Sequence, residues 1–139
     1  MRRMRFLSVL AIAGLVAACS SSASGGGSSD VNATLKEWQF DLDSSTGPAG
    51  EITFHIQNDG EKTHEFVVIK TDTMSDSLPV DEANDEVDET AFTPVDEVED
   101  ITSGSSAELT VDLEPGHYVI LCNLTGHYSK GMHADFTVE

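Results

Sequence analysis

Apolar and polar residues alternate over several short segments of this chain, and a period of two is the pattern of half-buried β-strands. Residues 51–58 read EITFHIQN, and residues 106–113 read SAELTVDL. Residues 64–70 (HEFVVIK) are rich in β-branched and aromatic side chains, which favour strands. Alternation places these apolar residues on common faces: Ile52, Phe54 and Ile56; Leu109, Val111 and Leu113; Tyr118, Ile120 and Cys122; Phe136 and Val138.

Turn signals separate these predicted strands. TGPAG, NDGEK, TSGSS and EPG contain the residues that most often interrupt regular structure. Short strands at this spacing predict one all-β sandwich over residues 31–139, which is long enough for a modest core. The segment TLKEWQF is expected to be the first strand, with Trp38 and Phe40 facing the core.

Residues 72–100 depart from the strand pattern, because they hold twelve acidic residues and no basic one. Val80, Ala83 and Val87 follow Pro79 at helical spacing, so we expect a short helix or an irregular excursion inserted between two strands. One interpretation of this acidic insertion is a solvated loop. The other is an acidic docking face for a partner protein.

Residues 1–18 have the composition of an export signal. MRRMR is positively charged, and the apolar run of thirteen residues that follows it is short for a bilayer span. The run ends in VAAC, which resembles the lipobox of bacterial lipoproteins and predicts a signal peptide over residues 1–18 and a lipidated Cys19. An ordinary signal peptide cleaved nearby and an uncleaved anchor are the alternatives. Residues 19–30 then form a Ser/Gly-rich linker.

The charge balance narrows the choice of partners. Without residues 1–18, the chain keeps four lysines, no arginine and all 25 acidic residues. Such a surface repels phosphate groups, so we expect no charge-driven binding to nucleic acid or to anionic lipid. The balance suits a basic protein partner or a salty environment.

A set of soft metal ligands surrounds the last predicted turn. Cys122, His127 and Met132 follow a predicted strand at intervals of five residues, and His64 begins a separate strand. Strand ends at one pole of a sandwich can converge, which would bring two imidazoles, one thiolate and one thioether together. These are the ligands of a blue-copper electron-transfer site, in which the methionine is the weak axial ligand. Zinc more often takes several thiolates or three histidines, iron–sulfur clusters need more cysteines, and calcium and magnesium need oxygen ligands.

The joint spacing carries this prediction, because a lone histidine at a strand start is usually structural and a lone methionine is usually core filler. His133 adjoins Met132 and competes as a ligand candidate, although alternation places it on the opposite side. His55 and His117 fall on the outward faces of their strands, so we expect neither to bind the metal.

Two stretches, AGEITFHIQNDGEKTHEF and LEPGHYVILCNLTGHYSKGMHADFTV, resemble the cupredoxin family, which includes plastocyanin, azurin and auracyanin. The resemblance covers nearly the whole predicted domain and is closest to small exported copper-binding proteins. It implies an eight-stranded Greek-key β-sandwich with one type 1 copper ion. The ligands it implies are His64, Cys122, His127 and Met132.

Two features depart from that family pattern. Glu65 follows the first ligand, where plastocyanins and azurins carry a small amide that braces the two ligand loops. We expect Glu65 and Asn123 to brace the loops here, with the Glu65 carboxylate accepting N–H groups from the Cys122 loop. The acidic insertion over residues 72–100 is not part of the minimal family fold.

The resemblance implies a one-electron carrier that docks transiently to redox partner proteins. In the family, the histidine at the position of His127 reaches the surface through an apolar patch where electrons enter and leave. With Cys19 lipidated, the carrier would be exported and anchored at the outer face of the cytoplasmic membrane, facing the periplasm or the extracellular side. A basic partner could also contact the acidic insertion.

Two other function classes compete with the electron carrier. A protein that sequesters or delivers copper is the alternative, although the Met- or His-rich tracts typical of copper stores are missing. No enzyme is expected, because five histidines without an H-x-H pair cannot build the extra centres of multicopper oxidases or nitrite reductases.

Overall fold

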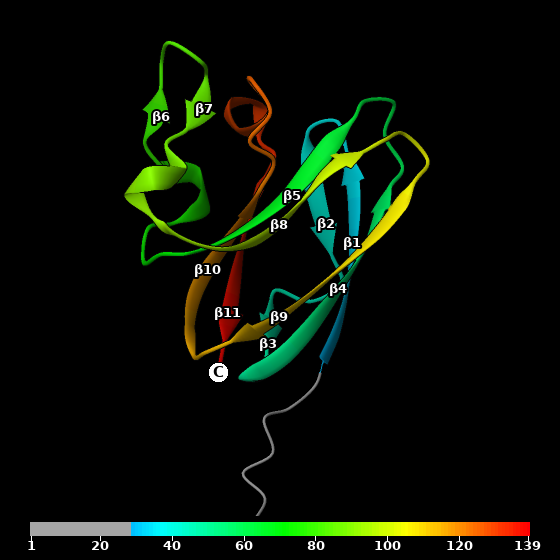
Figure 1. Cartoon of the computed structure of the whole chain (residues 1–139), viewed down its shortest axis with the longest axis vertical. Coiled ribbons are helices and arrows are strands. Elements are labelled where there is room, and N and C mark those ends of the chain that lie inside the picture. Colours follow the sequence, from blue (N-terminus) through cyan, green and yellow to red (C-terminus); the bar gives the residue numbers. More distant parts are fainter. Residues whose placement is uncertain (1–28) are drawn as a thin grey trace, which may run out of the picture.

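The structure, a computed structural model, describes residues 29–139 and consists of two main β-sheets. The four-stranded sheet has the order β2–β1–β4–β9, and the five-stranded sheet has the order β3–β11–β10–β5–β8. Figure 1 shows how the strands of the two sheets are arranged in one sandwich. The first sheet contains β1 (Ser29–Lys36), β2 (Gln39–Leu42), β4 (Gly50–Asn58) and β9 (Ser106–Leu113). The second contains β3 (Thr46–Gly47), β5 (His64–Lys70), β8 (Thr93–Ile101), β10 (Gly116–Leu121) and β11 (His133–Val138).

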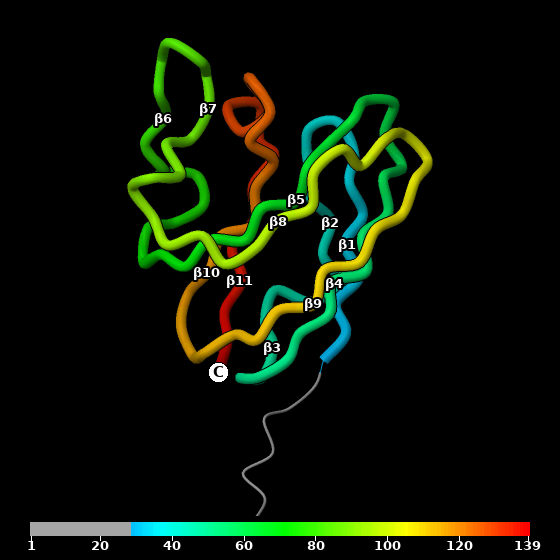
Figure 2. Tube along the Cα trace, in the orientation of Figure 1, coloured from blue at the N-terminus to red at the C-terminus, as the bar shows by residue number. Residues whose placement is uncertain are grey.

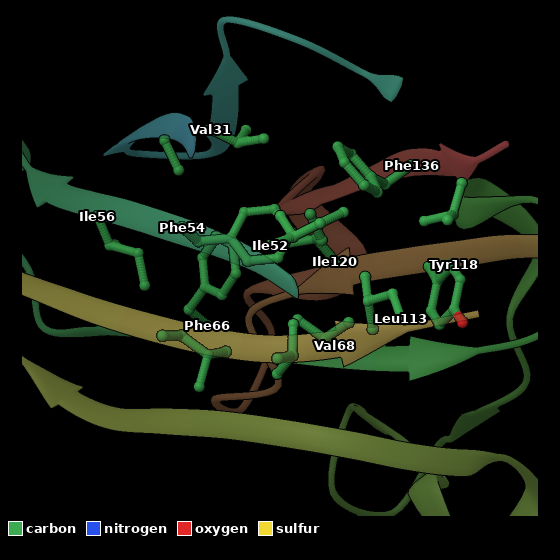
Figure 3. Packing of buried hydrophobic residues seen from close by; sticks show 14 of the residues in the cluster. Val31, Ile52, Phe54, Ile56, Phe66, Val68, Leu113, Tyr118, Ile120 and Phe136 are labelled. Carbon is green, nitrogen blue, oxygen red and sulfur yellow. The ribbon is translucent and has the colours of Figure 1, made fainter. Parts of the chain in front are cut away.

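The main core lies between these sheets, and alternation explains its composition. β4 and β9 are antiparallel neighbours, with Phe54 opposite Leu109. The Phe54 ring contacts rings from the other sheet, with centroids 5.2 Å from that of Phe66 and 5.4 Å from that of Phe136. Figure 3 shows these side chains meeting between the strands. The prediction of an all-β sandwich with these apolar faces is confirmed.

The N-terminal part of the domain differs from the prediction in two places. Residues 1–18, Cys19 and most of the predicted linker lie outside the described residues, but Ser29 and Asp30 of that linker belong to β1. The prediction that Trp38 faces the core was wrong. β1 ends at Lys36, and Trp38 lies in the turn before β2, half-buried and outside the core cluster. Phe40 packs against the core as expected.

The acidic insertion is shorter than predicted, and of the two expected forms it takes the irregular excursion instead of an α-helix. Residues 71–92 hold two three-residue 3₁₀ helices, η1 (Ser75–Ser77) and η2 (Glu89–Ala91), and the hairpin of β6 (Val80–Asp81) and β7 (Glu86–Val87). Val80 pairs with Val87 across this hairpin, which explains the spacing that was interpreted as helical. Residues 93–100, predicted as part of the insertion, belong to β8, which pairs with β5. Within residues 29–139, no helix has the length and apolar character needed to cross a membrane.

The segment 71–92 covers the outer face of the five-stranded sheet. β5 is apolar on both faces: Phe66 and Val68 point into the sandwich, whereas Val67 and Ile69 point outward. The insertion places Leu78 on this outward face, and together these side chains build a second apolar cluster with Val87, Val119, Leu121 and Tyr128. Figure 2 shows the β6–β7 hairpin standing beside the segment that follows β10. The segment is therefore a packed part of the domain, and neither of the two interpretations from sequence described that role.

Candidate metal centre

The predicted ligand residues lie at one pole of the sandwich because three of them adjoin strand ends and His127 lies in the loop between β10 and β11. His64 is the first residue of β5, and Cys122 directly follows β10. His127 precedes the 3₁₀ helix η3 (Tyr128–Lys130), and Met132 immediately precedes β11. β5 and β10 are antiparallel neighbours, with Val67 opposite Leu121, so the start of β5 and the end of β10 meet.

Three donor atoms converge at this pole. The Nδ1 atoms of His64 and His127 are 3.2 Å apart, and Cys122 Sγ is 3.2 Å from His127 Nδ1. One ligand atom from each of the three residues lies within 4.8 Å of the others. Two imidazole nitrogens and a sulfur at such separations can share one metal ion.

Cys122 is fully buried and is the free cysteine of the described chain. Burial raises the pKa of its thiol to about 11, although the backbone N–H groups of Glu65 and Leu124 act in the opposite direction. The N–H of Glu65 lies 3.4 Å from Sγ. Because an apolar site disfavours the bare thiolate, deprotonation of Cys122 at neutral pH requires a bound cation.

The two histidines are poised as neutral ligands. Burial lowers the pKa of His64, and burial also lowers the pKa of His127. A neutral imidazole keeps one nitrogen lone pair for a metal, whereas the protonated ring has none. His64 is 0% exposed and His127 is 9% exposed, so the second ring is the one near the surface.

Met132 is fully buried at the end of the same loop. Its backbone N–H donates to the carbonyl of His127 at 3.2 Å, and its own carbonyl accepts from the N–H of Cys122 at 3.1 Å. These bonds close the loop between the cysteine and the methionine. The axial role of the Met132 thioether remains a prediction.

The two predicted bracing residues have different roles. Burial raises the pKa of the Glu65 carboxyl to about 7, and a bond from the N–H of Asn123 partly offsets this effect. Asn123 itself faces the insertion: its Oδ1 accepts from the N–H of Val87 at 2.7 Å, and its Nδ2 donates to the Val87 carbonyl at 2.9 Å and to Glu89 Oε1 at 2.7 Å. The Asn123 side chain thus joins the ligand loop to the acidic segment.

Two residues at the centre were missed by sequence reasoning. Glu37 Oε1 lies 3.2 Å from Nε2 of His64, and the ring of Trp38 meets that of His127 edge-on with centroids 4.8 Å apart. Both belong to the turn between β1 and β2, which the apolar pattern merged into a single strand. No local motif marks them, because their contacts join residues that are far apart in the sequence.

The other histidines are engaged elsewhere in the described structure. His133 Nδ1 lies 3.0 Å from Ser75 Oγ, and the ring is tilted against that of Tyr128. His117 lies on the outer face of β10 as predicted, where its Nε2 is 2.9 Å from Asp135 Oδ1 and the ring is partly covered. His55 is 40% exposed on the outer face of β4, in agreement with the prediction.

The model of the cupredoxin-like domain family matches residues 8–138. The chain belongs to this family. The resemblance seen in the sequence is thereby confirmed, and the sandwich described above is a cupredoxin fold. No match was found among curated proteins.

Solved cupredoxin structures share the fold at low sequence identity. Rusticyanin from Thiobacillus ferrooxidans has a TM-score of 0.62 and 16% identity, over 84% of this chain and 79% of its own. Auracyanin A from Chloroflexus aurantiacus, described as a "blue" copper protein, has a TM-score of 0.58 and 18% identity, over 81% and 100%. The azurin Az-iso2 from Methylomonas sp. strain J has a TM-score of 0.58 and 17% identity, over 79% and 97%.

The donor set of this cupredoxin fits one type 1 copper ion. Two imidazoles and one thiol converge, and a buried methionine follows in the same loop. A carboxylate-rich calcium or magnesium site would need oxygen ligands, which the cluster does not offer among residues 29–139. A soft thiolate with two imidazoles is the set that selects copper in trigonal sites.

Proposed function

We propose that this cupredoxin is a type 1 copper protein that carries single electrons between redox proteins. The observation that carries the proposal is the convergence of His64 Nδ1, His127 Nδ1 and Cys122 Sγ at a buried pole. When bound there, copper supplies a couple between Cu(I) and Cu(II). The protein contributes a fixed geometry, so that little rearrangement accompanies the transfer.

The ligand loop is built to keep that geometry. Its backbone bonds run from His127 N–H to the Leu124 carbonyl at 2.8 Å and from Gly131 N–H to the Tyr128 carbonyl at 2.8 Å. Gly131 has φ 115°, a conformation that L side chains rarely adopt, and a Cβ there would lie 3.2 Å from the carbonyl oxygen of Trp38. The loop therefore closes tightly against the β1–β2 turn, which supports a rigid carrier site.

We place the electron entry and exit at His127. Its ring is the more exposed of the two imidazoles, and Trp38 lies against it. The ammonium of Lys130 lies 4.6 Å from the centroid of the Trp38 ring. A half-buried indole beside the ligand offers a partner protein an apolar contact surface, which favours brief docking over a permanent complex.

The acidic segment next to this surface supports docking to a basic partner. The carboxylates of Asp85 and Glu86, in the β6–β7 hairpin, accept from the hydroxyls of Ser129 and Thr125, so negative charge lies beside the ligand loop. Charge of this kind acts mainly on the rate of encounter. Lysines 62 and 130 both act on His127 and lower its pKa, so the rim of the pole is mixed in sign.

We further propose that the protein is exported and lipid-anchored through Cys19, with the carrier facing the periplasm or the extracellular side of the cell membrane. The support is the VAAC sequence and the Ser/Gly-rich stretch that follows it. Two or more acyl chains hold a protein on a membrane far better than one. Replacing Cys19 by Ser should leave an unprocessed precursor or release the protein, whereas wild-type protein that is wholly soluble and carries no lipid mass contradicts the anchor.

The carrier function is tested with the isolated domain loaded with Cu(II). Wild-type protein should show an intense thiolate-to-copper charge-transfer band in the visible range and a reversible one-electron wave. Cys122→Ser should abolish the band, and a band that persists would place the site elsewhere. His133→Ala is the matched control, because His133 lies near the loop but outside the cluster. Tight copper binding without a reversible wave would favour sequestration or delivery.

A further inference from the structure

The carboxylate of Glu37, in the β1–β2 turn, is held in one position by several contacts. Oε1 of Glu37 accepts from the N–H of Lys62 at 2.8 Å, and Oε2 accepts from the N–H of Glu61 at 3.2 Å. A Cβ at Gly60 would lie 2.7 Å from Oε1, so the neighbouring turn leaves room for the carboxylate only because residue 60 is a glycine. The two backbone N–H bonds and the space left by Gly60 together fix the position of the Glu37 carboxylate.

The held carboxylate points at the buried ligand His64. Glu37 Oε1 lies 3.2 Å from Nε2, and the imidazole is 0% exposed while the carboxylate is 24% exposed. Both carboxylate oxygens accept backbone N–H bonds, and a glutamate side chain is ordinarily ionised near neutral pH, so Glu37 is an anion here. An anion cannot donate, and the hydrogen of this bond therefore belongs to Nε2 of His64.

Placing the hydrogen on Nε2 also determines the state of the other ring nitrogen, Nδ1. With its hydrogen on Nε2, a neutral His64 keeps its lone pair on Nδ1, which is the atom that lies 3.2 Å from Nδ1 of His127. A carboxylate behind a ligating histidine also raises the basicity of the ligand. Its negative charge stabilises the oxidised metal more than the reduced one, because Cu(II) carries one more positive charge than Cu(I).

We propose that Glu37 is a positioning residue that holds His64 in its Nε2–H form, with Nδ1 directed at the metal, and that its charge lowers the reduction potential of the centre. The electronic half of this inference rests on the proposed function, and the tautomer half stands on the protein alone. Loss of such an outer partner typically costs about ten- to a hundredfold in metal affinity. If the loss falls on Cu(II) by about tenfold relative to Cu(I), the potential rises by about 59 mV for one electron.

The experiment compares wild type, Glu37→Gln and the control Glu61→Gln, which removes a neighbouring exposed charge and keeps the backbone N–H that bonds to Glu37. Nitrogen chemical shifts of the metal-free protein report the tautomer of His64. We expect wild type and Glu61→Gln to be protonated at Nε2, and Glu37→Gln to lose this preference. Voltammetry of the copper forms should show a raised potential for Glu37→Gln alone, and Glu37→Asp should lie closer to wild type because it keeps the charge.

Each measurement tests one half of the proposal, the tautomer of His64 or the effect of Glu37 on the reduction potential. An Nδ1–H tautomer in wild-type protein overturns the proposal, even if Glu37→Gln fails to fold. Equal potentials for Glu37→Gln and Glu61→Gln overturn the electronic role, because only net charge would then matter. If wild-type protein binds no copper, the carrier function fails while the tautomer measurement still tests the contact between Glu37 and His64.

Discussion

The two histidines of the metal centre both contact the β1–β2 turn, but otherwise they depend on different regions of the molecule. His64 is fully buried, begins a strand, and is held from behind by one carboxylate in the β1–β2 turn. His127 is close to the surface, lies in a loop, and depends on backbone bonds within the loop and on contacts with Trp38. The loop in turn is joined to the acidic insertion through Asn123 and Gly126.

Because the two histidines are supported differently, changes on the two sides of the site should have different effects. The His64 side uses the sheet framework and a single charged partner, so changes there should alter the electronic properties of the metal more than the stability of the fold. The His127 side uses a segment whose attachment is mostly an apolar cluster and a few polar bonds. Changes there should alter the stability and motion of the loop more than the chemistry of the ligands.

The largest effect should follow from breaking the apolar attachment of the insertion. Leu78 is 5% exposed and belongs to the outer cluster over β5 and β10. Leu78→Ala should lower the free energy of unfolding by about 2–5 kcal/mol, since it removes buried methyl groups and leaves a cavity. Urea unfolding of the metal-free protein measures this loss.

Met74 provides the control for that variant, because it is 56% exposed in the same segment. Met74→Ala should change the free energy of unfolding by less than about 0.5 kcal/mol. Similar small effects from both variants would mean that the insertion contributes little to stability, and the comparison between the two sides of the site would lose its basis.

A smaller effect should follow from removing the polar link. Asn123→Ala leaves the N–H and the carbonyl of Val87 without the side chain that binds both. Because these groups are shielded by the insertion, we expect a loss of about 1–3 kcal/mol. Amide hydrogen exchange should quicken in residues 123–131 and stay unchanged at the start of β5.

Asn32→Ala is suited as the comparison, since that amide binds only the exposed Asp43 among the described residues. Uniformly faster exchange at both ligand strands after Asn123→Ala would show that the two sides of the site are not separately supported.

A third effect concerns pH and the entry to the insertion. The Asp135 carboxylate accepts from the N–H and the hydroxyl of Ser75, both at 2.8 Å, and lies 2.9 Å from His117 Nε2. Burial acts to raise the pKa of Asp135, but the bonds from Ser75 and His117 outweigh it, and the net pKa is lowered. A lowered folded-state pKa stabilises the fold above the unfolded value of 3.8, and this stability is lost as pH falls through the folded value.

Asp135→Asn should therefore reduce the free energy of unfolding at neutral pH by about 1 kcal/mol, a modest figure because solvent partly screens the group. The difference between variant and wild type should shrink as pH is lowered below about 4. Thermal melting of the metal-free forms across this range is the measurement, and a difference that is constant with pH contradicts the role of the charged carboxylate.

The smallest effect is expected from the charge of the insertion. Asp85 and Glu86 bond to Ser129 and Thr125 of the ligand loop, so neutralising them would disturb the site itself. Asp72, Asp76 and Glu82 are exposed and bond to none of the ligand loop, which makes them the cleaner test of docking. Changing these three to amides should slow electron transfer to a cationic cobalt complex by about threefold at low salt.

At physiological salt the effect should nearly vanish, since the field of surface charges fades within about 8 Å. The matched set is Asp41, Glu51 and Asp112, which are exposed on the four-stranded sheet, the layer that the insertion does not cover. If both sets slow the reaction equally, net charge alone matters and the insertion has no special part in docking.

The sandwich and the four ligand candidates could be read from the sequence because both follow local rules. Alternation identifies strands such as residues 50–58, and the spacing of Cys122, His127 and Met132 lies within one loop. The covering role of the insertion also has a signal in the sequence, in the strand at residues 64–70. HEFVVIK is apolar on both faces, which indicates that both faces of its sheet are covered.

The remaining parts depend on contacts that no local pattern encodes. Glu37 reaches His64 because the turn that follows β1 lies beside the loop that leads into β5, and Lys62 of that loop bonds to Glu37. Val80 and Val87 fit both a helix and a hairpin, and the choice was made by the turn chemistry of Asp81, whose side chain accepts from the N–H of Ala83 at 2.9 Å. Trp38 satisfied the strand pattern and yet lies in a turn.

The direction of β1 determines how far the metal pole lies from the start of the domain at Ser29. β1 begins at Ser29 and ends at Lys36, directly before the turn that touches both histidines, while Figure 1 shows the chain entering at the opposite end of the sandwich. An eight-residue strand spans about 26 Å. If Cys19 carries lipid as proposed, the opposite end of the domain would face the membrane, and the electron-exchanging end would be turned outward toward partners that never touch the membrane.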